Sequence, residues 1–233
     1  MLFGALSPDG SHSTSKTGYY IGANDTFVLV HELMNMVPDP RAAVVTLEWE
    51  YITAASAAAA GGFAPVRAAF LDIDGACGSF TDTSDVDVPA GMTVFKLSME
   101  PAWTAAASAA GRIVTTFGHV HDGGVLLETT RNGRVVCATV PVYGGSPGFV
   151  DPPPAPAAGG EEEHHHMPGM DMGYRGGGLA HVSSMQPCEG LGRIEAGDVW
   201  SVVATYNLTA RPAMVDHHGE TVPIMGIVGL YFA

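Results

Sequence analysis

The amino-acid sequence predicts an all-β fold: an antiparallel β-sandwich or jelly roll with one long loop rich in Gly, Pro, His and Met. Three observations support this. The chain has 30 glycines and 16 prolines among 233 residues, which favours a turn-rich β protein over a helical bundle. Many short apolar or alternating segments are separated by turn signals. The length suits one large all-β domain or two small ones.

The first half of the chain predicts an irregular arm at residues 1–18 and the opening strands of a single domain over residues 19–233. In residues 42–52 the side chains of Val45, Leu47, Trp49 and Tyr51 alternate with a more polar set, as in a half-buried strand. An alanine-rich segment, 54–62, predicts one or two helical turns, and 105–110 predicts a short helix or a loop. The strands expected here are 19–21, 26–33, 42–52, 66–73 and 92–99.

The second half begins with a predicted three-strand meander. A strand ends in Gly118-His119-Val120-His121, a second covers 125–130, and Asn132-Gly133 makes a hairpin turn into a third at 134–143. Residues 144–179 show no periodicity and form a long inserted loop, and loops of this length are usually functional or disordered. Further strands are expected at 179–185, 199–206 and 223–233.

The pair His119 and His121 predicts a metal site. On a strand the two side chains point to the same face, with Cα atoms roughly 6–7 Å apart, so both imidazoles can reach one ion. Imidazole ligands suit copper, zinc, iron or nickel, and Gly118, Gly123 and Gly124 leave space beside them. The alternative is two solvated histidines on an exposed strand, because this motif is short.

Composition excludes several classes of partner. The net charge is -14, and only 15% of residues are charged, which argues against nucleic acid or an anionic membrane as a partner. No apolar run is long enough for a membrane span, and the N-terminus does not resemble a signal peptide. The sequons at Asn24 and Asn207 are compatible with glycosylation and secretion. We therefore expect a secreted or cell-surface protein whose signal peptide is absent from this chain.

Several segments together resemble a known copper domain. They are Gly118 to Gly124, Asn132-Gly133, Cys137 and Pro223-Ile224-Met225-Gly226. They resemble the C-terminal domain of the copper type II, ascorbate-dependent monooxygenases, such as peptidylglycine α-hydroxylating monooxygenase. The resemblance is closer to the stress-upregulated nodulin-19-like proteins, and it adds Leu33-Met34-Asn35, Trp49-Glu50-Tyr51 and Leu71 to Asp74. It covers roughly residues 19–143 and 179–233.

This resemblance implies a β-sandwich with one copper ion bound by His119, His121 and Met225. Two imidazoles and one thioether form a soft ligand set that suits Cu(I). Taken alone, Met225 is as well explained by core packing. The resemblance does not extend to the second copper domain of the monooxygenases, with its three electron-transferring histidines, because only His12 and His31 precede residue 118.

Other histidines and methionines give weaker predictions. His181 is a candidate further ligand or a neighbour of the ligands, and Asp122 is a candidate hydrogen-bond partner for a ligand imidazole. His217-His218 are expected in a solvated loop and His31 in the core. Six residues of the long loop could chelate copper or belong to a low-complexity acidic segment: His164, His165, His166, Met167, Met170 and Met172.

The three cysteines allow one disulfide and one free thiol. Cys137 with Cys188 would bracket the long loop, and Cys77 could equally take either place.

Three functions follow. The first is an extracellular, single-domain copper-binding protein in copper handling or at the cell surface or matrix. The second is a mononuclear copper-dependent oxidoreductase, a monooxygenase or peroxygenase. The third is a structural, self-associating surface protein with a vestigial site.

Overall fold

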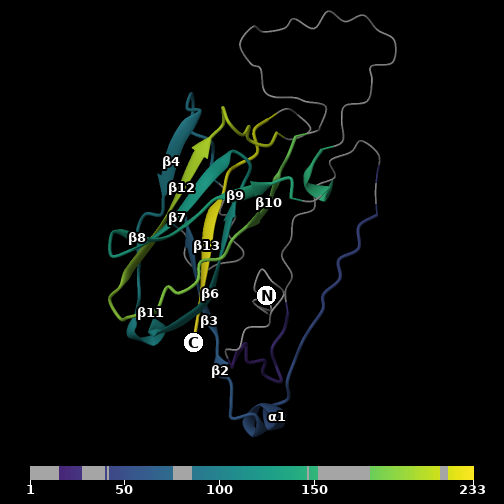
Figure 1. Ribbon diagram of the computed structural model, residues 1–233, viewed down its shortest axis with the longest axis vertical. Helices are drawn as coiled ribbons and strands as arrows, with labels where there is room; N and C mark the ends of the chain where they lie inside the picture. The colour runs from purple at the N-terminus through teal and green to yellow at the C-terminus, as the bar shows by residue number, and fades with distance from the viewer. Residues whose placement is uncertain are drawn as a thin grey trace, which may run out of the picture.

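Two antiparallel sheets pack face to face in the computed structural model, which describes residues 16–27, 40, 42–75, 86–145, 147–151, 179–215 and 220–233 (Figure 1). The first sheet has the strand order β11-β6-β13-β3, and the second has the order β4-β12-β7-β8 with β5 also paired to β12. The all-β sandwich predicted from the sequence is confirmed. The strands of the first sheet are β3 (Arg67–Asp72), β6 (Gly111–Val120), β11 (Arg193–Ile194) and β13 (Gly226–Phe232). The strands of the second sheet are β4 (Val94–Ser98), β5 (Trp103–Thr104), β7 (Gly124–Arg131), β8 (Arg134–Thr139) and β12 (Val199–Asn207).

The hydrophobic core lies between these sheets. Inward-facing residues alternate along each strand, and in β12 every second residue from Trp200 to Tyr206 is fully buried. They pack against residues of the facing sheet that are also fully buried, among them Leu71, Val120 and Leu230. This alternation is what an antiparallel sheet with one covered face requires.

The remaining elements lie around the sandwich. They are β1 (Thr17–Gly18), α1 (Ala54–Ala59), β2 (Ala64–Pro65), η1 (Ala107–Ala109), β9 (Pro141–Tyr143), η2 (Pro147–Phe149) and β10 (Val182–Met185). β1 pairs with β2, and β10 pairs with β9. In Figure 1, α1 lies beyond the end of the sandwich. No helix in the described residues is long and apolar enough to cross a membrane.

Most strands lie where the sequence predicts them, and the hairpin turn at Asn132-Gly133 is confirmed. Asn132 has φ 52° and Gly133 has φ 75°, the positive pair that a type I′ turn needs. The segment 105–110 contains the short helix η1. The range 26–33 lies mostly outside the described residues.

Two predicted strands in the first half are wrong. Residues 19–21 are not a strand, since β1 ends at Gly18, and residues 42–52 form no ladder with any described strand. In the second segment both alternating sets are exposed, with Val44 at 88% and Tyr51 at 82%. Alternation predicts a strand with one covered face, but here every residue is exposed, even Trp49, whose ring contacts that of Phe27 edge-on.

Candidate metal centre

The sandwich brings His119, His121 and Met225 to one end of the first sheet. β6 pairs with β13 in the register His119 with Ile227 and Val120 with Gly226. One residue further, the amide of His121 donates to the carbonyl of Met225 at 3.3 Å. His121 and Met225 are therefore direct cross-strand neighbours, whose Cβ atoms lie about 5 Å apart in such pairs. His119 shares their face, because alternate residues of a strand point the same way.

The two imidazole rings lie close to one another. Their centroids are 5.3 Å apart and their planes make an angle of 84°. Two imidazoles that bind one metal ion at about 2.0 Å have centroids roughly 5 Å apart. The spacing of His119 and His121 therefore fits a shared ion.

Hydrogen bonding sets the tautomer of His121. Its Nδ1 lies 2.7 Å from the carbonyl oxygen of Pro223. A carbonyl only accepts, so Nδ1 carries the proton and the lone pair of Nε2 is free for a metal. No described residue hydrogen-bonds a ring nitrogen of His119. Both rings can thus offer a nitrogen to one ion.

The electrostatic surroundings keep His119 neutral. Desolvation by the surrounding protein, assisted by the nearby His121, lowers the pKa of His119 to about 4, and the charge of Asp122 partly opposes this. His119 is nevertheless an exposed residue, so contact with solvent limits the size of this pKa shift but not its direction. A neutral imidazole is the form that binds metals, so the ring is ready for an ion at neutral pH.

Two tyrosines hold the segments that carry the ligands. The Tyr206 hydroxyl donates to the carbonyl of Met225 at 2.5 Å. The Tyr143 hydroxyl accepts from the amide of Gly123 at 3.1 Å and donates to the carbonyl of Gly124 at 2.7 Å. The sequence analysis missed both residues, because their partners are main-chain groups on distant strands. The only signal was an aromatic residue at a strand end.

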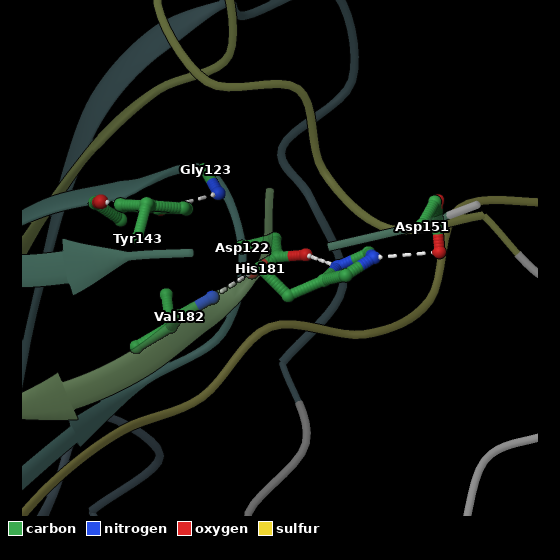
Figure 2. Close-up of polar contacts among 7 residues, drawn as sticks. Asp122, Gly123, Tyr143, Asp151, His181 and Val182 are labelled. Carbon is green, nitrogen blue, oxygen red and sulfur yellow. Dashed lines mark hydrogen bonds and ion pairs between the residues drawn. The ribbon is translucent and has the colours of Figure 1, made fainter. Parts of the chain in front are cut away.

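The side chain of His181 lies between two carboxylates (Figure 2). Its Nδ1 contacts Asp122 and its Nε2 contacts Asp151 at 3.1 Å, while the other oxygen of Asp122 accepts from the amide of Val182 at 2.9 Å. Both ring nitrogens are thus engaged in this conformation. A ligand role for His181 stays a prediction. Asp122 bonds the His181 ring, so the expected bond from Asp122 to a ligand imidazole also stays a prediction.

Among the described residues, a third ligand would have to be of a type other than His, Cys, Asp or Glu. Within the described ranges, no three His, Cys, Asp or Glu side chains converge closely enough to hold a metal ion. The main-chain bond from His121 to Met225 places Met225 beside the pair, and the role of its thioether as a ligand stays a prediction. Two imidazoles and a thioether suit Cu(I) better than zinc, which more often takes thiolate or carboxylate ligands.

Several predicted residues lie outside the described part of the chain, and their roles stay predictions. They are His12, His31, Cys77, His164, His165, His166, Met167, Met170, Met172, His217 and His218. A disulfide joins Cys137 and Cys188. Asn24 and Asn207 are described, but nothing in the structure tests their glycosylation.

The chain is similar to two curated proteins named as probable copper-dependent oxygenases. It is 27% identical over 218 residues to clz3 of Cochliobolus lunatus, an alignment that covers 93% of this chain and 57% of clz3. It is also 27% identical over 218 residues to M1 of Phoma sp. (strain ATCC 20986 / MF5453), covering 93% of this chain and 46% of M1. No family model and no solved structure matches.

The chain spans about half the length of the curated relatives it matches. Their names agree with the predicted likeness to copper monooxygenases at the level of copper-dependent oxygen chemistry. Neither name mentions peptidylglycine hydroxylation or nodulin-19-like proteins.

Proposed function

We propose that this chain provides the copper site of a copper-dependent oxidoreductase, with His119, His121 and Met225 as the ligands. The observation that carries the proposal is the pair of imidazoles 5.3 Å apart, with Nε2 of His121 left free by the bond from Nδ1 to Pro223. The names of both relatives support oxygenase chemistry over copper binding alone. Copper bound here would supply one-electron redox chemistry with dioxygen or peroxide.

The residues of this chain have definite tasks in such a site. The carbonyl of Pro223 orients the His121 ring, and the hydroxyl of Tyr206 holds the main chain of Met225. His119 stays neutral and needs no deprotonation before it binds a metal. Three protein ligands leave a coordination position open, as catalytic sites require.

The finer assignments belong to the same proposal. The likeness to the nodulin-19-like proteins rests on the motifs around His119 and Met225. An extracellular location is supported by the disulfide between Cys137 and Cys188, because disulfides persist mainly in oxidising compartments.

Copper affinity and turnover, measured together, test the proposal. The variants are His119→Ala/His121→Ala, a matched control His217→Ala/His218→Ala, and a deletion of residues 161–172. We expect more than about 100-fold weaker copper binding only in the first, since even the loss of an outer-shell partner costs 10–100-fold. With ascorbate, copper-loaded protein should consume dioxygen faster than copper-free protein and faster than the loaded His119→Ala/His121→Ala variant.

Two results would contradict the proposal in different ways. If tight copper remains in His119→Ala/His121→Ala, the ligands are wrong. If the wild-type protein holds copper at this pair but shows no reductant-dependent dioxygen or peroxide consumption, the site binds copper without catalysis, and a role in copper handling replaces the oxidoreductase.

A further inference from the structure

The group formed by Asp122, His181 and Asp151 has no part in the proposed ligand set, yet it lies directly beside it. Asp122 follows His121 in the chain. Its carboxylate binds the His181 ring with one oxygen and the amide of Val182 with the other. Figure 2 shows the His181 ring between Asp122 and Asp151.

Hydrogen-bond chemistry fixes the charge of this group. Both nitrogens of His181 face carboxylate oxygens, and an ionised carboxylate only accepts. Both nitrogens therefore carry protons, and the ring is a cation. Burial alone would lower the pKa of His181, but its bonds and charge interactions with Asp122 and Asp151 outweigh this and raise it.

Burial makes these charges effective at a distance. The side chains of Asp122 and His181 are only 3% and 10% exposed, whereas Asp151 is 27% exposed. Solvent screens buried charges much less than exposed ones. The charge of Asp122 already acts on the ligand His119 and on both tyrosines beside the site.

We propose that the buried ion pair of Asp122 and His181 sets the charge next to the copper centre and so the balance between Cu(I) and Cu(II). The inference rests on the proposed function. Asp122 and His181 lie outside the proposed ligand set and act here as positioning residues. The negative charge of Asp122 favours Cu(II), and the positive charge of His181 offsets part of that preference.

The ratio of the dissociation constants for Cu(II) and Cu(I), measured by competition with chelators at neutral pH and low salt, tests this. Asp122→Asn removes a negative charge and should raise the ratio between about three- and thirty-fold. His181→Gln removes a positive charge and should lower it by a similar factor. Asp151→Asn should raise it less, because Asp151 is more exposed. The double variant Asp122→Asn/His181→Gln should return close to the wild-type ratio.

A neutral change close to His181 is the control for a merely structural role. Ser183→Ala removes two hydrogen bonds, to the amide of Gly145 and to the carbonyl of Val142, without changing charge, so the ratio should stay at the wild-type value. Shifts of the same sign in Asp122→Asn and His181→Gln, or no shift in either, would overturn the inference while leaving copper at His119 and His121. If His181→Gln does not fold, the comparison of Asp122→Asn with Ser183→Ala still decides the direction of the shift. If copper persists in His119→Ala/His121→Ala, the proposed function and this inference fall together.

Discussion

At the scale of single residues, the proposed copper site contains two imidazoles that differ in their surroundings. His121 has its Nδ1 proton held by the carbonyl of Pro223, while His119 has no described hydrogen-bond partner and is kept neutral by desolvation. The two rings therefore offer nitrogens for different reasons. A hydrogen bond fixes the tautomer of His121, whereas the unfavourable desolvation of a positive charge keeps the His119 ring neutral.

The low pKa of His119 is directly measurable. In metal-free protein its ring should titrate near pH 4, more than two pH units below an ordinary histidine, because desolvation and the neighbouring His121 disfavour the charged form. The folded-state pKa lies below the unfolded value. The unfolded state therefore binds a proton first as the pH falls from about 6.5 to 4, and the free energy of unfolding decreases over that range.

An NMR titration of the histidine ring protons, assigned with His119→Ala, makes the measurement. His119→Ala should also show a weaker loss of stability than wild type between pH 6.5 and 4. A His119 resonance that titrates near pH 6.5 would show that the ring is well solvated. Desolvation would then not be what keeps this candidate ligand neutral.

The shared face of His119 and His121 could be predicted from the sequence, but the surroundings of the two rings could not. Alternation on a strand places His119 and His121 on one face whatever the rest of the chain does. The role of His181 depends on contacts with Asp122 and Asp151, which lie 59 and 30 residues away in the chain. No local sequence pattern predicts these contacts. From the sequence, His181 could therefore be recognised only as a histidine close to a segment that matches the copper-domain pattern.

At the scale of elements, the site exists because β6 and β13 pair in one register. A shift by one residue would turn His119 and His121 to the opposite face. Gly226 begins β13 directly after Met225, and a Cβ added there would lie 2.7 Å from Cβ of Ala204 and 2.9 Å from Cγ2 of Ile73. The two sheets approach closely at this point, which explains the glycine.

Gly226→Ala should therefore destabilise the protein by about 1–3 kcal/mol, the usual cost of overpacking a core. Neither obstructing atom lies at the free end of a long side chain, so the sheets must move apart next to Met225. Urea unfolding measures the change, and copper affinity should fall with it. Gly18→Ala is the matched control, because a Cβ there meets nothing within 4 Å. Equal stability in both variants would show that the sheets are less closely packed at Gly226 than the structure describes.

Strand prediction succeeded where local pattern and burial agree. The alternating apolar residues of β12 and the apolar run of β13 are both buried in the core. Residues 42–52 show the same alternation without any described partner strand. Periodicity reports which side chains share a face, but it does not report whether another segment covers that face.

At the scale of the whole molecule, the disulfide between Cys137 and Cys188 ties β8 to the segment after β10. The two cysteines are 51 residues apart in the sequence, and the loop that their bond closes includes the long segment 152–178. The amide of Cys188 also bonds the Thr116 hydroxyl on β6 at 2.8 Å. The cross-link therefore joins β8 to a segment that is bonded to β6, the strand that carries His119.

Removing this disulfide should lower the free energy of unfolding by about 2–4 kcal/mol, because an open loop of this length has more conformational freedom in the unfolded chain. Cys137→Ala/Cys188→Ala tests this by urea unfolding, with Cys77→Ala as the control for loss of a cysteine outside the pair. A larger loss in Cys77→Ala than in the double variant would contradict the pairing.

The ligand set itself is the central claim, and X-ray absorption spectroscopy of the Cu(I)-loaded protein tests it most directly. The account predicts two imidazole nitrogens and one sulfur around copper in the wild-type protein. Met225→Leu, which conserves volume, should remove the sulfur and leave both nitrogens. A copper environment without sulfur in the wild-type protein, or one whose sulfur survives in Met225→Leu, would contradict the assignment of Met225 and with it the proposed metal centre.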